Sequence, residues 1–316
     1  MSVPLVSVCI LTCNHVRYIG DCIMSAVSQS SDVSLEILVG DDCSDDGTSD
    51  IVHSLVQQFP GLIHHVRHQT RDAGKNYQFL IGLASGKYIA HLDGDDYWLP
   101  GKLIRQIKIL EESPEVTACY TNALCVNEAE ELVGFFNNRQ PQSIDLDYLL
   151  RRGNFLNNST AVYRAKYKHF FIDRPPTYLD YTIHLVLAQH GTLAYLNFYG
   201  TGYRVSTTTS LIRNHGEFVR EMYWRAICEV PENMVATDSK LWAEADFIRR
   251  VFFLSLRIAD LGLLGRWWLN VSSGSRSRGR LFLMSLAAVL AVGSRELLEF
   301  GLRRLYKSFV RIVYWR

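Results

Sequence analysis

Two acidic clusters in the 316-residue sequence could bind a metal ion or a nucleotide. Residues 93–96 read DGDD and follow an apolar run, and residues 41–47 read DDCSDDG and follow another. Mg²⁺ usually takes one or two carboxylates together with substrate phosphates. Asp93 and Asp95, which flank a glycine, could therefore hold a divalent metal ion against a diphosphate leaving group. Taken alone, they would equally suit a solvated acidic turn.

The cluster at residues 41–47 also resembles the beginning of a calcium-binding loop. Asp42, Ser44 and Asp46 match the first ligand positions of an EF-hand loop, but His53 stands where that loop requires a bidentate glutamate. The segment before the cluster has the pattern of a strand rather than a helix. We therefore exclude the calcium-loop interpretation.

Other common cofactor motifs are missing from the sequence. No glycine-rich dinucleotide fingerprint follows the first apolar run, and there is no P-loop and no H-E-x-x-H pair. The seven cysteines include no C-x-x-C pair, and their odd number fits a reducing compartment better than a disulfide framework. The formal net charge of +1 gives no overall attraction to nucleic acid.

The elements that must position the acidic clusters follow from hydrophobic periodicity. Apolar runs predict four buried strands, at residues 6–11, 35–39, 62–66 and 87–92. Helical spacing predicts intervening helices at residues 19–27, 51–59 and 77–84 and a further one after Pro100. We expect Thr48 or Ser49 to cap the second helix and Pro60 to end it.

This alternation of strands and helices predicts an α/β fold with a mostly parallel sheet and helices on both faces. Ligands bind such sheets at the carboxyl ends of the strands. The polar residues 12–14 and both acidic clusters come directly after predicted strands, so we expect them to converge at one edge of the sheet.

The pattern changes from residue 116 onward. Short strands are predicted at residues 116–120, 161–163 and 193–203, and a helix at residues 180–190 should end at Gly191. We expect this part to form a mixed sheet that completes the domain and shapes a second pocket.

The last hundred residues have a helical pattern and are basic. From residue 251 onward, eleven lysine and arginine residues stand against three acidic ones. The uncharged residues 281–292 are too few to span a bilayer, which needs about 20 residues. An apolar stripe and a basic stripe predict an interfacial amphipathic helix, although packing against the same domain or a partner chain stays an alternative. The stripes consist of Leu298, Leu302, Leu305, Phe309 and Ile312 and of Arg303, Arg304, Lys307 and Arg311.

With these features placed, residues 4–205 resemble a family 2 glycosyltransferase of the GT-A fold. Four segments carry the resemblance through their order and spacing: residues 6–14 (VSVCILTCN), 39–48 (VGDDCSDDGT), 86–98 (GKYIAHLDGDDYW) and 179–181 (LDY).

The resemblance implies a nucleotide-binding role for the residues of the first half. Asp42 matches the carboxylate that recognises the nucleotide base, and Thr12 and Asn14 lie in the loop that lines the nucleotide pocket. Lys75 falls near the position of a basic residue close to the diphosphate.

The resemblance also implies a metal site and a catalytic base. Asp93 and Asp95 match the D-x-D motif, with Asp95 expected to contact a Mg²⁺ or Mn²⁺ ion directly. Asp180 matches the base that takes a proton from the acceptor hydroxyl in an inverting displacement. The residue type and position of Asp180 would equally suit a helix N-cap.

We therefore expect residues 1–112 to form a nucleotide-sugar-binding half and residues 113–215 an acceptor-binding half of a GT-A domain, followed by a helical basic extension at residues 216–316. The expected donor is a UDP-sugar. The expected acceptor is a surface polysaccharide or another glycan, with a lipid-linked glycan at the cytoplasmic face of a membrane as one form. The start of the sequence lacks a signal-peptide pattern, which favours the cytoplasm.

Two alternatives from other classes share the expected scaffold. A sugar nucleotidyltransferase would have the same layered sheet and acidic metal turn, but it usually has a glycine-rich basic loop after the first strand. Residues 12–15 (TCNH) are not such a loop. A non-catalytic nucleotide-sugar-binding protein would have no need of Asp93, Asp95 and Asp180.

Overall fold

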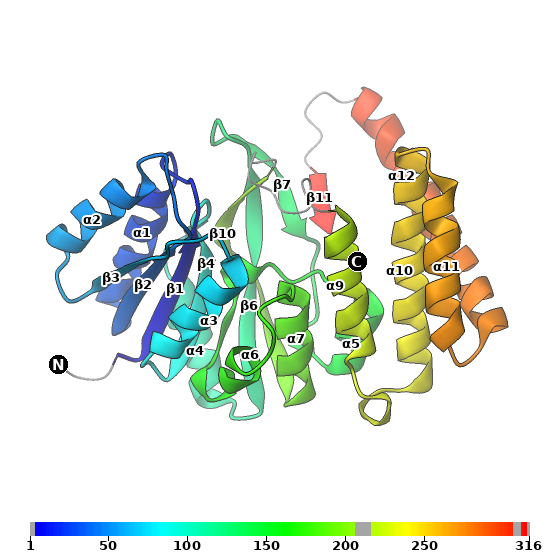
Figure 1. The fold of residues 1–316 in the computed structure, drawn as a ribbon, viewed down its shortest axis with the longest axis horizontal. Coiled ribbons are helices and arrows are strands. Elements are labelled where there is room, and N and C mark those ends of the chain that lie inside the picture. The colour runs from blue at the N-terminus through cyan, green and yellow to red at the C-terminus, as the bar shows by residue number, and fades with distance from the viewer. Residues whose placement is uncertain (1–3, 206–215, 306–310, 315–316) are drawn as a thin grey trace.

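A computed structural model describes residues 4–205, 216–305 and 311–314 of the chain (Figure 1). Its central feature is a mixed sheet whose strands follow the order β11-β7-β6-β9-β4-β1-β2-β3, with β10 beside β6. Helices cover both faces of this sheet, and further helices extend from one end. The predicted α/β architecture is confirmed.

The four predicted N-terminal strands form the parallel part of the sheet, in which β1 pairs with β2 and β4, and β2 pairs with β3. They are β1 (Val6–Thr12), β2 (Leu35–Asp41), β3 (Ile63–Arg67) and β4 (Tyr88–Asp93). The register sets Thr12 beside Asp41 and Leu11 beside Asp93. The polar loop and both acidic clusters therefore leave the sheet at the same edge, as expected from the sequence.

Four helices connect or follow these strands: α1 (Ile19–Val27), α2 (Thr48–Gln58), α3 (Ala73–Leu83) and α4 (Lys102–Glu112). The expected N-cap of α2 is wrong, because Gly47 precedes the helix with a φ of 99° and Thr48 is its first helical residue. The Asp46 carboxylate accepts a 3.0 Å hydrogen bond from the Thr48 N–H and so satisfies a free donor of the first turn.

The second half of the sheet is mixed, as predicted. Strand β6 (Val116–Val126) pairs in parallel with β10 (Thr192–Arg204), and β9 (Val162–Arg164) lies antiparallel between β4 and β6. The sequence patterns did not predict the strands β5 (Tyr97–Trp98), β7 (Leu132–Asn137) and β8 (Ser143–Ile144).

Three α-helices and several 3₁₀ turns complete this part of the chain. The α-helices are α5 (Leu146–Arg152), α6 (His169–Ile172) and α7 (Asp180–Gln189). The 3₁₀ turns are η1 (Ser28–Ser31), η2 (Asn158–Thr160), η3 (Ala165–Tyr167) and, later in the chain, η4 (Glu232–Met234).

The two faces of the sheet have separate hydrophobic cores. One lies under α1, α2 and α4, and the other combines residues of α3, α5 and α7 with the C-terminal helices. Lys102 is fully buried near the first core, with its Nζ 4.2 Å from the centroid of the Trp98 ring. Burial lowers the pKa of Lys102 to about 7, because the charged ammonium has lost its water there.

The C-terminal extension is helical, as predicted, and lies at the end of the molecule far from β1, β2 and β3 (Figure 1). Its helices are α9 (Gly216–Cys228), α10 (Thr237–Arg257), α11 (Leu261–Gly274) and α12 (Arg278–Leu305). Helix α10 packs against both α11 and α12. In the part of the chain that the structure describes, no helix is both long and apolar enough to cross a membrane.

The prediction of an amphipathic helix that continues to Ile312 is wrong. Helix α12 ends at Leu305, and β11 (Arg311–Tyr314) pairs in parallel with β7. The unpaired edge of β7 offers backbone hydrogen bonds to a returning segment, which a periodicity argument does not include. Lys307 and Phe309, assigned to the basic and apolar stripes, lie outside the described residues.

Candidate active site

The loops after β1 and β2 are joined by short hydrogen bonds. The N–H of Asp42 donates to the Thr12 carbonyl at 2.8 Å, and the N–H of Asn14 donates to Ser44 Oγ at 2.9 Å. Asn14 adopts a φ of 57°, a conformation that asparagine tolerates better than most residues. Three residues predicted to bind the nucleotide, Thr12, Asn14 and Asp42, thus lie together.

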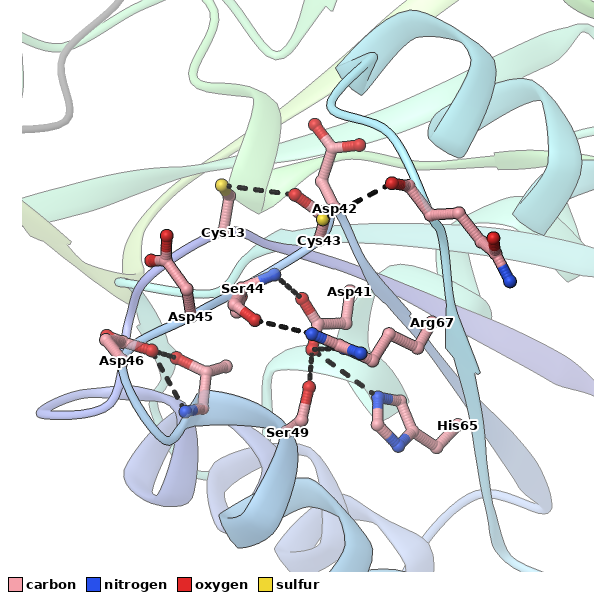
Figure 2. A network of polar contacts seen from close by, with 12 residues as sticks. Cys13, Asp41, Asp42, Cys43, Ser44, Asp45, Asp46, Ser49, His65 and Arg67 are labelled. Atoms are coloured by element: carbon pink, nitrogen blue, oxygen red, sulfur yellow. Dashed lines mark hydrogen bonds and ion pairs between the residues drawn. The ribbon is translucent and has the colours of Figure 1, made fainter.

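The neighbouring carboxylates of Asp41 and Asp42 point in different directions (Figure 2). Asp41 is fully buried and accepts hydrogen bonds from the Ser44 N–H, at 2.9 Å, and from the Ser49 hydroxyl. Burial alone would raise the pKa of Asp41, but these bonds and His65 hold it well below its usual range. Asp41 therefore stays ionised, and its carboxylate holds the loop in place through these hydrogen bonds.

Asp42 has an environment suited to a ligand. Its Oδ1 accepts a 2.8 Å hydrogen bond from the N–H of Asp72, and burial raises the pKa of Asp42 although that bond opposes the shift. Lys75 follows in the first turn of α3, with its Nζ 3.2 Å from Asp72 Oδ2 and its side chain 70% exposed. Asp72 therefore links Asp42 to Lys75, whose ammonium is accessible to solvent and to an anionic ligand.

The DGDD turn after β4 packs directly against the loop after β1. The N–H of Gly94 donates to the Leu11 carbonyl at 2.7 Å. A Cβ atom added to Gly94 would lie 2.8 Å from Thr12 Oγ1 and 2.8 Å from His15 Nδ1. Only glycine fits here, so the predicted nucleotide loop and the predicted metal turn are in contact.

The Asp93 carboxylate is held by two neighbours. His91 Nε2 lies 3.0 Å from Asp93 Oδ1, and the Ser159 hydroxyl lies 3.2 Å from Oδ2. Burial would raise the pKa of Asp93, but His91 and Ser159 outweigh it and lower the pKa. Asp93 is thus an oriented carboxylate at the end of β4.

The following two aspartates differ in their burial. Asp96 is fully buried and accepts hydrogen bonds from the Ser159 hydroxyl at 2.5 Å and from the Arg204 N–H at 2.9 Å. Burial and the nearby Asp95 and Asp93 raise its pKa well above the usual range. Asp95 is half-buried, and its carbonyl accepts a hydrogen bond from the Arg204 guanidinium. Ser159 of η2 and Arg204 at the end of β10 therefore both hold the turn in place.

This turn suits a divalent ion that completes its coordination with a ligand. Within the described residues, no three histidine, cysteine or acidic side chains are grouped closely enough to hold a metal by themselves. Two carboxylates, Asp93 and Asp95, with phosphate oxygens and water form a donor set that Mg²⁺ accepts. The residues present therefore fit an ion that is bound together with a diphosphate.

Asp180 is the first residue of α7 and not its N-cap, which is Leu179. The alternative role of Asp180 as the N-cap of this helix is therefore excluded. Its Oδ1 accepts hydrogen bonds from Asn154 Nδ2 at 2.9 Å and from the N–H of Tyr181 at 2.8 Å. Burial and, to a smaller extent, the Asp93 carboxylate raise the pKa of Asp180 to about 6, although these hydrogen bonds oppose the shift. Asp180 and Asp93 are thus close enough to interact electrostatically.

The sequence patterns missed four residues that shape this region. They are His91, Asn154, Ser159 and Arg204, which contact Asp93, Asp180, Asp96 or the backbone of Asp95. His91 could have been found, because residues two apart on a strand lie on the same face. The other three reach the site from distant loops and strands, and no local spacing marks them.

Comparison with protein families gives one clear match. A family model described as Glycosyl transferase family 2 matches residues 7–170. Among curated proteins, an Escherichia coli UDP-Glc:alpha-D-GlcNAc-diphosphoundecaprenol beta-1,3-glucosyltransferase is 28% identical over 221 residues, which cover 69% of this chain and 84% of that protein. An uncharacterized protein of Mycobacterium tuberculosis is 28% identical over 197 residues, which cover 60% of this chain and 56% of its own length. The chain thus spans little more than half of that relative.

Solved structures share the fold at low sequence identity. Staphylococcus aureus TarS 1–349 in complex with UDP-GlcNAc has a TM-score of 0.59 and 17% identity, with 90% of this chain and 89% of that chain covered. A mannosyltransferase of Pyrobaculum calidifontis in complex with GDP-Man and Mn²⁺ has a TM-score of 0.57 and 14% identity, with 98% and 89% covered. These likenesses support the GT-A architecture.

Proposed function

The chain belongs to glycosyl transferase family 2, and from this premise we propose that it moves a sugar from a nucleotide-diphosphate sugar to an acceptor hydroxyl, with inversion at the anomeric carbon. One observation carries the proposal. A carboxylate with a pKa near 6, Asp180, interacts electrostatically with the DGDD turn that contacts the loop after β1. A carboxylate with a pKa close to neutral pH supports the proposed role of Asp180 as a general base.

On the donor side, Asp42 is proposed to accept hydrogen bonds from the nucleotide base, in a pocket lined by Thr12 and Asn14. The hydrogen bond between Asp42 and Thr12, and the bond that joins Asn14 to Ser44 of the same loop as Asp42, support a shared role. Lys75 is proposed to attract the diphosphate with its exposed ammonium group.

Asp95 and Asp93 are proposed to hold a Mg²⁺ or Mn²⁺ ion. Such an ion supplies charge that stabilises the departing nucleotide diphosphate. The chain's own contribution is to orient the carboxylates, through His91 and Ser159 on Asp93 and through Arg204 on the backbone of Asp95.

On the acceptor side, Asp180 is proposed to take the proton from the attacking hydroxyl. Both of its hydrogen bonds among the described residues go to Oδ1, which leaves Oδ2 as the proposed proton acceptor. Residues 1–112 would then bind the donor and residues 113–215 the acceptor. Of the expected extension at residues 216–316, the helices α9 to α12 would pack against the acceptor-binding half, while β11 joins the sheet.

A UDP-sugar is the proposed donor, and surface-polysaccharide synthesis is the proposed setting. The relative from Escherichia coli is named for UDP-Glc and a diphosphoundecaprenol-linked acceptor, and the Staphylococcus aureus structure contains UDP-GlcNAc. By analogy, a lipid-linked glycan is the proposed acceptor, and the cytoplasmic face of an anionic membrane is the proposed location.

An exposed apolar face on α12 supports this membrane contact. Leu283 and Leu290 are each 64% exposed, and Phe282 and Leu286 are exposed beside them. Exposed arginines lie at the start of the same helix, including Arg278. Apolar side chains flanked by arginines match an anionic bilayer surface. The proposed membrane contact therefore uses residues 282–290 of α12, which precede the apolar stripe that was expected from Leu298 onward.

Thermal unfolding in the presence of UDP, GDP, dTDP or CMP, each with and without Mn²⁺ or Mg²⁺, tests the donor site. A ligand that binds the folded state raises the unfolding temperature. We expect UDP with metal to raise it, and Asp95→Ala to abolish the metal-dependent part. A well-folded protein that responds to no nucleoside diphosphate would refute the proposed donor site.

A further inference from the structure

Asn154 lies in the proposed acceptor-binding half and contacts the proposed base, Asp180. Its Nδ2 donates a 2.9 Å hydrogen bond to Asp180 Oδ1. The opposite amide orientation would set a carbonyl oxygen against a carboxylate, so electrostatics selects the donor orientation. The loop after α5 thus fixes one oxygen of Asp180.

Tyr223 of the C-terminal helix α9 contacts both residues that hydrogen-bond Asp180. Its Oη accepts a 3.1 Å hydrogen bond from the backbone N–H of Asn154. Its ring stacks on the ring of Tyr181, with centroids 4.7 Å apart and an interplanar angle of 22°. The N–H of Tyr181 is the other donor to Asp180. One side chain of the extension therefore supports both hydrogen-bond donors.

Tyr223 is itself held firmly against this loop. The guanidinium of Arg250 lies 5.2 Å from the centroid of the Tyr223 ring, and Arg250 Nε donates to Asp246 Oδ2 at 2.8 Å. Gly153, which precedes Asn154, has a φ of 72°, and a Cβ added there would lie 2.5 Å from Tyr223 Oη. Tyr223 of α9 and Arg250 of α10 therefore both contact this loop closely.

We propose that Asn154 and Tyr223 are positioning residues, through which the C-terminal helices aim Oδ2 of Asp180 at the acceptor hydroxyl. The inference rests on the proposed function, in which Asp180 is the base. It assigns α9 and α10 a role in the transfer reaction that is independent of any contact with a membrane.

The electrostatic surroundings of Asp180 give this role a measurable signature. Burial raises its pKa, the hydrogen bonds from Tyr181 and Asn154 lower it, Asp93 raises it, and His91 lowers it. Loss of the Asn154 bond removes a donor that favours the charged form. The base would then need a higher pH to lose its proton.

The experiment compares pH–rate profiles of full-length Asn154→Ala and Tyr223→Phe with the wild type, using UDP-Glc and UDP-GlcNAc, the nucleotide-sugars named for the relatives, as donors. For Asn154→Ala we expect kcat to fall about 10- to 100-fold, because Oδ2 of Asp180 would no longer point correctly at the acceptor hydroxyl. The acidic limb of kcat/KM should move upward by about one pH unit. The KM for the donor and the thermal shift with UDP and metal should stay unchanged.

Tyr223→Phe retains the ring stack and removes the hydroxyl, which accepts from the Asn154 N–H and also interacts with Arg250. It should fold and lose about 3- to 10-fold in kcat. The double variant should lose less than the product of the two single effects, because Tyr223 acts partly through Asn154. Matched controls are Asn270→Ala, an exposed asparagine of α11, and Tyr167→Phe, a tyrosine of η3. Both should behave like the wild type.

The outcomes separate the two proposals. An Asp180→Asn variant that retains full activity would refute the proposed base, and with it the function on which this inference rests. The positioning role alone would be refuted by a different result. In that case Asp180→Asn is inactive, but Asn154→Ala and Tyr223→Phe have the rates and the pH–rate profiles of the wild type. A loss of rate in Asn154→Ala without any shift of the acidic limb would also refute it.

Discussion

Gly94 lies so close to Thr12 that a Cβ atom on Gly94 would be 2.8 Å from the Thr12 hydroxyl oxygen. Thr12 ends β1 and Gly94 follows β4, and these strands are neighbours in the sheet. The loop proposed to bind the nucleotide and the turn proposed to bind the metal therefore form one rigid unit. A change in either should disturb the other.

We expect Gly94→Ala to test this coupling. The new methyl group must displace Thr12 or move the turn, and with it both flanking aspartates. A misplacement of about 1 Å can cost roughly 100-fold in rate, so we expect a loss of that order in kcat/KM. Titration with UDP and Mn²⁺ should show weaker binding of both ligands. Gly82→Ala, where an added Cβ meets nothing within 4 Å, is the control.

The pKa of Asp180 predicts a pH dependence of the transfer reaction. The base acts only when it is deprotonated, and burial raises its pKa to about 6. We therefore expect kcat/KM to fall about tenfold for each pH unit below 6 and to level off above 7. Asp180→Asn should lower kcat by roughly 10² to 10⁴ and leave the binding of UDP with metal intact. A flat profile from pH 5 to pH 8 would contradict this assignment.

His91 should influence metal affinity although it is not proposed to touch the metal. Its Nε2 lies 3.0 Å from Asp93 Oδ1 and orients that carboxylate. Loss of such a supporting partner typically weakens metal binding by about 10- to 100-fold. We expect His91→Phe to raise the Mn²⁺ concentration for half-maximal activity by that factor. His53→Phe, on the exposed side of α2, should have no effect.

Lys102 should reduce stability at neutral and acidic pH. Its pKa falls from 10.5 in the unfolded chain to about 7 in the folded one, so between these values only the unfolded state holds the proton. Stability should therefore rise with pH across this window. We expect Lys102→Met to raise the free energy of unfolding by at least about 1 kcal/mol at pH 6. Denaturant titrations should show that this gain disappears towards pH 10.

The apolar face of α12 predicts binding to anionic vesicles. We expect the wild type to sediment with phosphatidylglycerol vesicles and the double variant Leu283→Glu and Leu290→Glu to stay in solution. Each leucine contributes up to about 1.5–3 kcal/mol on burial, so the two together exceed a tenfold change in affinity. Ile104→Glu, an exposed position on α4, is the matched control. Equal binding of the wild type and the double variant would contradict the proposed surface.

The local patterns of the sequence were sufficient for the parallel part of the fold. The apolar runs predicted β1 to β4, because a strand buried on both faces must be apolar along its length. The same argument brought Asp42 and the DGDD turn to one edge, since parallel strands end there together. The N-cap of α2 was predicted wrongly because its side-chain acceptor does not come from the N-cap residue. Gly47 is the N-cap, and Asp46, which precedes it, accepts the hydrogen bond from the Thr48 N–H.

Contacts between distant segments could not be predicted in this way. Asn154 and Tyr223 are far apart in the chain, and neither lies in a motif. The strand pattern at residues 311–314 is too short to distinguish it from the end of a helix, and only its partner β7 determines its form. Hydrogen bonding to a distant strand, rather than local sequence preference, determines the secondary structure of such segments.

The pairing of β11 with β7 has a consequence for biosynthesis. Strand β11 follows every other described element in the chain, so it is the last of them to leave the ribosome. Until it emerges, one edge of β7 has no strand beside it and can pair with another nascent chain. The helices α10, α11 and α12 are made before β11, so this edge stays open while they emerge.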